Sequence, residues 1–294
     1  MIIVITGPTC LGKSETAFEI AKRYNAEIIN GDAFQCYKEM EIGVAKPPKE
    51  FLEQVPHHLY SFVNLNHDYS IAEYQLNLRK TIDDLLCKNK NIIIVGGSGL
   101  YIRSALYDYE FLENKKVDMS KFLSMDDRTL HDELRKIDPI EAEKIHMNNR
   151  KRVLRAIEIY LSTGEAKSQL ISKQEHKSLY DVRFFVRDID RDVLYDKINK
   201  RVDLMIEQGL ENEVRNLYVQ YGHKVRAFQA IGYKEFVPYF KGQATLEEIT
   251  ENIKQNTRNY AKRQLTFIRH QFPVSFYKDT EDLLRIIKDE QLFR

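Results

Sequence analysis

Short apolar segments alternate with amphipathic segments along the first third of the chain. Residues 1–6 and 91–95 are mostly apolar runs of strand length, and residues 27–30 form another. Residues 12–24 and 69–88 carry apolar side chains at helical spacing, with polar side chains on the opposite side. Strand, helix and strand in this order predict a parallel sheet covered by helices.

The middle of the chain has a different pattern. From about residue 113 to residue 180 there is little strand signal and much helical periodicity, with helix starts predicted at Asp138-Pro139 and after residues 147–149. Further strands are predicted at residues 182–186 and 274–277, and further helices at residues 191–208, 210–221, 245–271 and from 281. We therefore expect an α/β core, residues 1–112 and 181–294, interrupted by a helical insertion domain, residues 113–180.

The composition is that of a folded protein. The chain has 294 residues, of which 43% are hydrophobic and 30% charged, and this excludes a disordered chain. No apolar run is long enough to cross a bilayer and no basic leader is present, so we expect a cytoplasmic protein without membrane attachment. Three cysteines without paired spacing argue against a disulfide framework or a zinc finger. The net charge of +1 argues, by itself, against a nucleic-acid partner.

A phosphate-binding motif follows the first predicted strand. The segment GPTCLGKS, residues 7–14, matches G-x-x-x-x-G-K-[ST] without a mismatch and precedes a predicted helix. Glycines allow backbone N–H groups to face an anion, and the helix N-terminus adds partial positive charge. We expect Lys13 to reach the phosphates and the Ser14 hydroxyl to bind Mg²⁺. The predicted diphosphate-binding residues are Gly7, Pro8, Thr9, Gly12, Lys13 and Ser14; they do not distinguish a kinase from a nucleotide hydrolase or a transferase.

Three polar side chains follow predicted strands at the edge where parallel sheets bind ligands. Asp32 can take a proton or hold Mg²⁺ through water, and an Asx turn or a helix cap is an equally good interpretation of its position. Gln35 can pair with the edge of an adenine or can be an exposed turn residue. Ser98 follows a Gly-Gly turn, so its hydroxyl either faces the same cleft or caps a helix.

Two stretches concentrate positive charge that the net charge conceals. Residues 144–155 and 254–269 each hold five Lys or Arg residues and no acid, and Tyr260 and Phe267 are interleaved in the second. Charge runs are usually solvated helix faces. A stripe of cations along one helix also suits a phosphate backbone. The predicted stripe consists of Arg258, Lys262 and Arg269.

Six sequence blocks occur in the order seen in tRNA dimethylallyltransferases, which the chain resembles over roughly residues 3–269. The blocks are GPTCLGKS, NGDAFQCYKEMEIGVAKP, VGGSGLY, RVDLMIEQGLENEV, QAIGYKE and TRNYAKRQLTFIR. The resemblance implies a P-loop NTPase-like parallel sheet. It also implies transfer of a dimethylallyl group from dimethylallyl diphosphate to the exocyclic amine of the adenosine immediately 3′ of the anticodon in tRNA. The phosphate loop would then hold a diphosphate leaving group rather than the tail of ATP.

The resemblance further implies roles for individual residues. Asp32 looks like the general base that accepts the amine proton, and Ser98 stands where the family usually has threonine and should bond the leaving oxygen. Arg201 resembles the arginine that clamps the diphosphate. Alternatively, Arg201 forms a salt bridge with Asp203 or Glu207 on its own helix and has no role in binding the diphosphate. The expected contacts with the tRNA anticodon stem-loop are Gln35 at a flipped adenine, Arg152 and Arg155 in the insertion, and Arg258, Lys262 and Arg263.

The sequence departs from the common family pattern at four positions. Ala33 replaces a serine, Val44 a threonine and Phe267 a tryptophan. Ser98 replaces a threonine, which keeps the hydroxyl and loses the methyl group that restricts its rotamer. Ala33 puts one supporting hydrogen bond in doubt, but no central role is missing. We therefore expect an active, monomeric enzyme.

Three other functions stay open from the sequence. One is an adenylate isopentenyltransferase that acts on a free nucleotide, which the basic stretches and the insertion disfavour. Another is a P-loop kinase, which leaves the QAIGYKE and TRNYAKRQ blocks unexplained. The last is a non-catalytic RNA- or nucleotide-binding protein, which predicts a disabled base or clamp.

Overall fold

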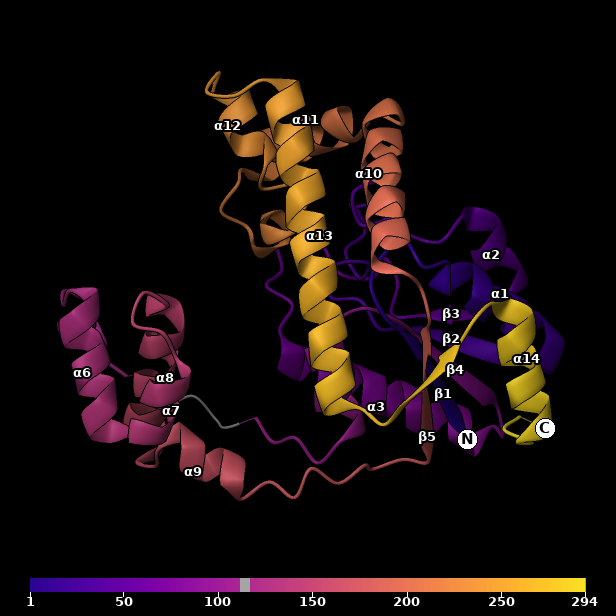
Figure 1. Ribbon diagram of the computed structural model, residues 1–294, viewed down its shortest axis with the longest axis horizontal. Helices are drawn as coiled ribbons and strands as arrows, with labels where there is room; N and C mark the ends of the chain where they lie inside the picture. Colours follow the sequence, from indigo (N-terminus) through magenta and orange to yellow (C-terminus); the bar gives the residue numbers. More distant parts are fainter. Residues whose placement is uncertain (112–116, 294) are drawn as a thin grey trace. The chain divides into compact units, whose positions relative to one another are not determined.

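The chain forms two compact units, shown in the computed structural model of Figure 1. The structure describes residues 1–111 and 117–293. The first unit is Met1–Leu106 with Ser178–Arg294, and the second is Tyr107–Lys177. The predicted start of the insertion, residue 113, lies outside the described residues. Its predicted end, residue 180, lies just beyond the observed end at Lys177.

A six-stranded parallel sheet forms the centre of the first unit, which confirms the predicted α/β class. The strand order is β3-β2-β4-β1-β5-β6. Every residue of β1 and β2 is buried, because helices cover both faces of such a sheet, and this produces the continuous apolar runs in the sequence. The strands are β1 (Ile2–Thr6), β2 (Ala26–Asn30), β3 (His57–His58), β4 (Asn91–Gly96), β5 (Val182–Arg187) and β6 (Val274–Tyr277).

Two long helices of the first unit begin at capping boxes that the sequence supplies. Ser70 and Glu73 form a reciprocal capping box at the start of α3, and Thr245 and Glu248 form another at the start of α13. The helices are α1 (Lys13–Tyr24), α2 (Lys49–Gln54), α3 (Ile71–Cys87), α4 (Gly99–Leu106), α10 (Arg191–Glu207), α11 (Leu210–Tyr221), α12 (Phe236–Phe240), α13 (Leu246–Gln271) and α14 (Thr280–Asp289), with a 3₁₀ turn at Arg226–Gln229.

The apolar pattern does not predict β3 or α4. β3 has only two residues, which is too short for an alternation to show. α4 is eight residues long and mostly apolar, so it has no polar face to mark a helical period.

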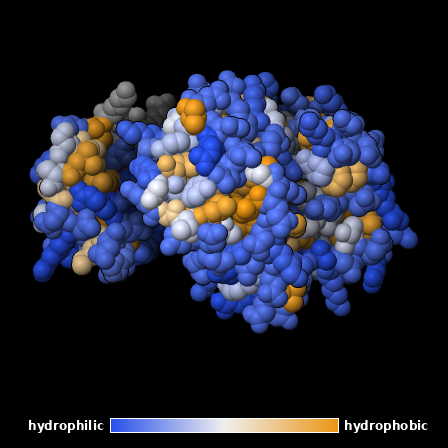
Figure 2. Space-filling model, turned by 90° about the horizontal axis from the view of Figure 1, so that it is seen from above, coloured by the Kyte–Doolittle hydropathy of each residue, from blue (hydrophilic) through white to orange (hydrophobic). Residues whose placement is uncertain are grey.

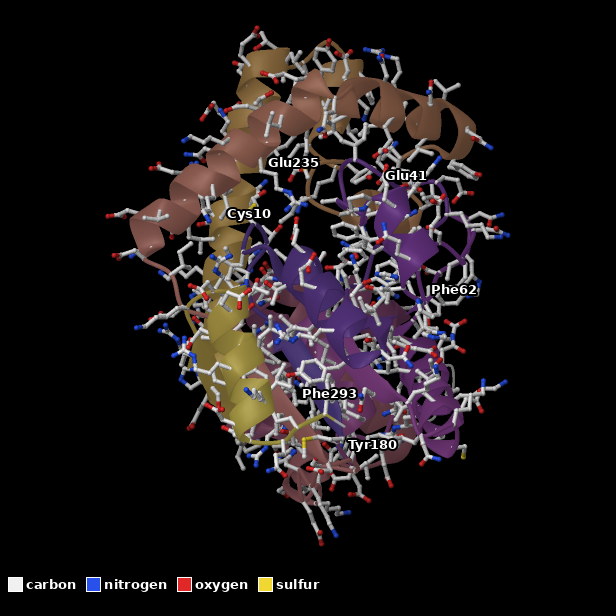
Figure 3. The ribbon with its side chains drawn as sticks, turned by 90° about the vertical axis from the view of Figure 1, so that its right-hand side faces the viewer. Cys10, Glu41, Phe62, Tyr180, Glu235 and Phe293 are labelled. Atoms are coloured by element: carbon white, nitrogen blue, oxygen red, sulfur yellow. The ribbon has the colours of Figure 1, made fainter. Side chains whose placement is uncertain are left out.

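Helices α1 and α14 pack on one face of the sheet. Ile20 of α1 and Leu283 of α14 join Ile3 and Ile5 of β1 in one buried cluster. Phe293, labelled in Figure 3, belongs to the same cluster, so the last residues of the chain close this core. Helices α10 and α13 of the same unit run beside each other in Figure 1.

The second unit is helical and has a core of its own. Leu130 and Leu134 pack against Val153 and Ile157. The Asp138 side chain accepts a hydrogen bond from the Glu141 backbone N–H at 3.0 Å, which confirms the helix start predicted there. Its helices are α5 (Ser120–Leu123), α6 (Asp127–Ile137), α7 (Pro139–Lys144), α8 (Arg150–Thr163) and α9 (Lys167–Ser172).

The surface is mainly hydrophilic. Figure 2 shows scattered apolar side chains on one face and a larger group of them near the middle of the view. Among residues 1–111 and 117–293, no helix combines the length and the apolar character that crossing a membrane requires.

Candidate active site

The loop between β1 and α1 has the backbone geometry of an anion-binding loop. Gly7 has a φ of 136°, and Cys10 and Gly12 lie in the left-handed region at 68° and 69°. A side chain at Gly12 would come within 3.3 Å of the Arg187 guanidinium, which donates a hydrogen bond to the Leu11 carbonyl at 3.1 Å. The loop leads directly into the twelve-residue helix α1, so the first-turn amides of this helix are available to an anion.

Lys13 lies over this loop in a desolvated position. Its Nζ donates to the Pro8 carbonyl at 2.6 Å. Burial lowers the pKa of Lys13 to about 8, with the positive charge of Arg201 on α10 acting in the same direction. The charge of Asp32 acts in the opposite direction. An anion bound here would relieve the repulsion between the two cations.

Asp32 lies at the end of β2 beside these cations. Its Oδ1 accepts the Phe34 backbone N–H at 2.9 Å, which is the Asx turn that the spacing allowed. Burial raises the pKa of this carboxyl, while the Phe34 N–H and the charges of Lys13 and Arg201 partly offset that increase. The turn and the functional role are therefore compatible, because the turn orients the carboxylate.

The turn that carries Ser98 is joined to the Asp32 loop. Gly96 packs so closely on Gly31 that a Cβ atom at Gly96 would clash with the Gly31 backbone. The Ser98 backbone N–H donates to the Gly31 carbonyl at 3.1 Å, and the Ser98 Oγ accepts the Ala33 N–H at 2.9 Å. This last bond uses the backbone of Ala33, so the missing serine side chain does not break the connection.

Helix α13 packs on the other side of the same turn. Gln264 donates from Nε2 to the Gly97 carbonyl at 2.8 Å. A Cβ atom at Gly99 would lie 2.5 Å from the Phe267 ring. The VGGSG glycines are therefore required for close packing, and phenylalanine at position 267 fills the space beside Gly99.

Tyr260 was not among the predicted site residues, yet it belongs to this site. Burial raises the pKa of Tyr260 to about 12, the charge of Asp32 acts in the same direction, and the nearby Ser98 hydroxyl and Arg263 charge act in the opposite direction. Tyr260 lies one helical turn before Gln264, and its signal in the sequence is its place among the basic residues of the stretch 254–269.

Glu213 of α11 is the second residue without a predicted role. It accepts hydrogen bonds from the backbone N–H groups of Ile42 and Gly43, at 2.8 and 3.2 Å, and from the Tyr233 hydroxyl at 2.6 Å. Three sequence blocks that are far apart in the chain therefore meet at one carboxylate, which holds the loop after the Asp32 turn.

Arg201 does not form the salt bridge with Asp203 or Glu207 that the sequence allowed. Asp203 pairs with Lys254 of α13 at 2.8 Å instead. In the described parts of the chain, the Arg201 guanidinium has no ion-pair partner of its own, although its charge reaches both Lys13 and Asp32. Among the described residues, no ion pair therefore neutralises the charge of Arg201.

The Gln35 side chain holds its own loop. Its Nε2 donates to the carbonyls of Val44 and Ala45, at 3.0 and 3.1 Å. Both amide hydrogens are thus engaged, so an adenine amine would be recognised by the side-chain oxygen. Val44 takes part through its backbone, and for this reason the family's threonine is not needed for the contact.

The basic residues of α13 differ in their availability. Lys262 and Arg263 are exposed, and the Arg263 guanidinium lies 5.8 Å from the centre of the Tyr260 ring. Arg258 is half-buried and donates to Asn199 and to Gln255. Only part of the predicted stripe is therefore open to a phosphate backbone.

The basic stretch of the second unit shows the same difference. Arg152 is exposed on α8, and Arg155 pairs with Glu158 at 2.6 Å. Arg150 pairs with Asp127 at 2.9 Å and is committed to the fold of this unit.

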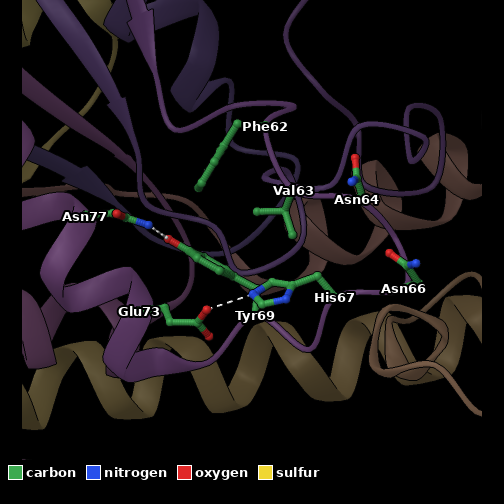
Figure 4. Close-up of a pocket in the computed structure, with 8 residues that line it drawn as sticks. All are labelled: Phe62, Val63, Asn64, Asn66, His67, Tyr69, Glu73 and Asn77. Carbon is green, nitrogen blue, oxygen red and sulfur yellow. Dashed lines mark hydrogen bonds and ion pairs between the residues drawn. The ribbon is translucent and has the colours of Figure 1, made fainter.

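A separate hollow of about 440 Å³ lies beside the Gln35 loop (Figure 4). Four of its polar side chains are paired with each other, since His67 contacts Glu73 at 2.7 Å and Asn77 donates to the Tyr69 hydroxyl at 2.9 Å. The hollow contains none of the predicted site residues. The lining residues are Phe62, Val63, Asn64, Asn66, His67, Tyr69, Glu73 and Asn77.

Comparison with known proteins shows the family of this chain. The model of the IPP transferase family matches residues 35–271. The chain belongs to the IPP transferase family. The tRNA dimethylallyltransferase of Anoxybacillus flavithermus is 44% identical over 287 residues, covering 96% of this chain and 92% of the relative. That of Bacillus cereus is 42% identical and covers 98% and 94%.

Solved structures of the family share the fold. A tRNA isopentenylpyrophosphate transferase from Staphylococcus epidermidis has a TM-score of 0.74 and 38% identity, covering 99% of this chain and 98% of that one. A eukaryotic dimethylallyltransferase acting on tRNA has a TM-score of 0.84 and 29% identity, covering 99% and 79%. The architecture described above is therefore that of the family.

Proposed function

We propose that this protein is a tRNA dimethylallyltransferase. It transfers a dimethylallyl group from dimethylallyl diphosphate to the exocyclic amine of the adenosine immediately 3′ of the anticodon, releasing diphosphate. The observation that carries the proposal is the placement of Asp32 beside Lys13 and Arg201, which puts a carboxylate base next to two cations and an anion-binding loop. A kinase can use a similar base, so the choice between the two activities rests on the relatives, which are named as transferases acting on tRNA.

The reaction forms one bond and breaks one. The adenine amine attacks the first carbon of the dimethylallyl group, and the carbon–oxygen bond to the diphosphate breaks with its electron pair on oxygen. Asp32 accepts the amine proton. Lys13, Arg201 and the Ser98 hydroxyl stabilise the charge that develops on the leaving oxygen.

The residues present fit a magnesium ion that is held mostly by its ligand. The described residues include no group of three or more His, Cys, Asp or Glu side chains able to hold a metal. Mg²⁺ at phosphate sites typically takes few protein ligands and several phosphate or water oxygens. The Ser14 hydroxyl, on the first turn of α1, would be its protein ligand. Bound Mg²⁺ would neutralise part of the diphosphate charge.

The partner is the anticodon stem-loop of tRNA. In this proposal Gln35 faces the flipped adenine, and Lys262 and Arg263 contact the phosphate backbone. Arg152 and Arg155 supply contacts from the second unit. In the same proposal the enzyme works as a monomer in the cytoplasm, where tRNA is found.

The pH dependence of kcat/KM for dimethylallyl diphosphate should be bell-shaped. Asp32 must be ionised, and its raised pKa moves the acid limb above the range of an ordinary aspartate. Lys13 must be protonated, and its pKa of about 8 places the basic limb near that pH. Measuring kcat/KM from about pH 4 to about pH 10 covers the titration of both groups. A profile that is still flat at about pH 9 would contradict the role of Lys13.

Neutralising Lys262 and Arg263 together should reduce the salt dependence of tRNA binding. Each lost phosphate contact lowers the slope of log K against log salt by roughly one. Binding titrations across a salt series measure the slope. Lys254→Ala is the matched control on the same helix, because Lys254 is already paired with Asp203 and Glu251. An unchanged slope in the double variant would exclude these two cations as phosphate contacts.

The activity itself is tested by incubating the protein with dimethylallyl diphosphate, Mg²⁺ and unmodified tRNA, followed by mass analysis of the nucleosides. The expected product is a dimethylallyl adenosine at the position 3′ of the anticodon. Parallel reactions contain AMP in place of tRNA, or ATP in place of dimethylallyl diphosphate. Modification of AMP alone would favour the adenylate isopentenyltransferase, and ATP turnover without transfer would favour a kinase.

A further inference from the structure

Glu213 on helix α11 holds the loop of residues 41–45 by three backbone hydrogen bonds. One of its carboxylate oxygens accepts the N–H groups of Glu41 and Ile42, at 3.1 and 2.8 Å. The other oxygen accepts the N–H group of Gly43 at 3.2 Å. Hydrogen bonds to a charged group are stronger than those between neutral groups, so three of them on consecutive residues fix the path of the backbone.

Tyr233 supports the same carboxylate and the same loop. Its side chain is fully buried, and its hydroxyl donates to Glu213 at 2.6 Å. A Cβ atom at Gly43 would lie 2.5 Å from the Tyr233 ring, so the loop backbone rests directly on this ring. The carboxylate is therefore oriented by the phenol, and the loop has no room to move toward it.

The far end of the loop orients the Gln35 amide. Val44 and Ala45 present carbonyl oxygens that accept from the Gln35 Nε2, at 3.0 and 3.1 Å. Ala45 lies in the left-handed region, with a φ of 50°, and its N–H donates to the Ile42 carbonyl at 3.0 Å. Such a backbone conformation in a residue other than glycine persists only where its surroundings hold it. The two carbonyls that orient Gln35 therefore depend on the part of the loop that Glu213 binds.

A fixed amide orientation selects the kind of base that can bind. The nitrogen of the Gln35 amide is engaged with two carbonyls, so only its oxygen faces a ligand, and this oxygen can accept from a 6-amino group. A 6-oxo purine, such as the base of inosine, presents an acceptor at the same place. Binding it would require the amide to turn over, which would leave the two loop carbonyls facing an oxygen.

We propose that Glu213 is a positioning residue which, through the loop of residues 41–45, fixes the Gln35 oxygen toward the base and makes the site select a 6-amino purine over a 6-oxo purine. This role rests on the proposed function, because Gln35 faces the target adenine in that reaction. The adenine amine carries two hydrogens, so one donates to Gln35 while the other passes to Asp32. Glu213 itself does not touch the base.

The test compares two anticodon stem-loop RNAs that differ only at the target position, which holds adenosine in one and inosine in the other. Binding titrations are made without dimethylallyl diphosphate, so that neither RNA reacts. The natural chain should bind the adenosine RNA roughly 10-fold more tightly, because one hydrogen bond forms and no two acceptors are opposed.

Two variants of Glu213 loosen the loop in different ways. Glu213→Gln keeps the size of the side chain and places a donor opposite the N–H groups or the phenol that now donate to it. Glu213→Asp keeps the charge, and its shorter side chain withdraws the carboxylate from the loop. Both should lower the preference for adenosine to about threefold or less, because the Gln35 amide is then able to turn over.

Glu211→Gln is the matched control, since Glu211 lies on the same helix and contacts Arg215 and Tyr239 rather than the loop. Its preference for adenosine should equal that of the natural chain. In a Gln35→Leu background, Glu213→Gln should not change the preference further, because the amide on which it acts is absent.

The ratio of the two affinities distinguishes positioning from general support of the fold. Equal weakening of both RNAs in the Glu213 variants, with the ratio of the natural chain, would assign Glu213 a purely structural role and overturn the proposal. A natural chain that transfers the dimethylallyl group yet binds both RNAs equally would overturn it as well. Absence of transfer to unmodified tRNA by the natural chain would instead refute the proposed function.

Discussion

Replacing Asp32 with asparagine should lower kcat for dimethylallyl transfer by about 100- to 10,000-fold, the range for loss of a general base. Asparagine cannot accept the amine proton, but its side-chain oxygen can still accept the Phe34 N–H that closes the Asx turn. The loop should therefore keep its shape, and tRNA affinity should change by less than about twofold. Single-turnover transfer and a tRNA binding titration measure the two quantities.

Two further variants separate chemistry from folding in this experiment. Asp32→Ala removes both the base and the turn contact, so it should lose activity to the same degree and also some stability. Asp84→Asn, at an exposed position of α3, makes the same chemical change away from the site and should be silent. If Asp32→Asn transferred the dimethylallyl group with the same kcat as the natural chain, Asp32 would not be the general base.

Replacing Arg201 with alanine should reduce kcat/KM for dimethylallyl diphosphate by about 100-fold, a loss typical of one preorganised donor to a developing charge. Arg201→Lys should recover only part of it, since lysine lacks the planar fork that matches two phosphate oxygens. Affinity for tRNA should be unchanged. Initial rates over a range of diphosphate concentrations, together with a tRNA titration, provide the measurement.

Arg201→Ala has a second signature that a general loss of stability would not produce. The positive charge of Arg201 lowers the pKa of Lys13, so its removal should shift the basic limb of kcat/KM to higher pH. Arg191→Ala, on the same helix α10 and exposed, should leave this limb in place. A loss of tRNA affinity alone in Arg201→Ala would identify the arginine as an RNA contact.

Hydrogen bonds that cross between blocks explain why the sequence departures are tolerated. Ala33 and Val44 both act through backbone atoms, as donor to Ser98 and acceptor from Gln35. Phe267 fills the space beside Gly99 with a smaller ring than tryptophan. Of the four departures, only Ser98 stands at a position to which the proposed function assigns a side-chain group, and serine keeps the hydroxyl.

All strands except β3, the long helices and the phosphate loop could be predicted from the order of residues along the chain. These features depend on short-range physics: burial on both faces produces apolar runs, a helix repeats every 3.6 residues, and a tight anion-binding turn needs glycine. Asp32 was also accessible in this way, because the carboxyl end of a parallel strand is the usual ligand side.

Which distant residues share the site became visible only in the folded chain. Nothing local in α10 shows that the charge of Arg201 reaches Lys13, or that Asp203 is occupied by Lys254. Nothing local in α13 distinguishes Arg258, which is bound to Asn199, from the exposed Lys262. Such partnerships depend on how helices pack, and packing depends on the whole chain. The net charge of +1 is a similar case, since its effect depends on which cations the fold pairs and which it leaves exposed.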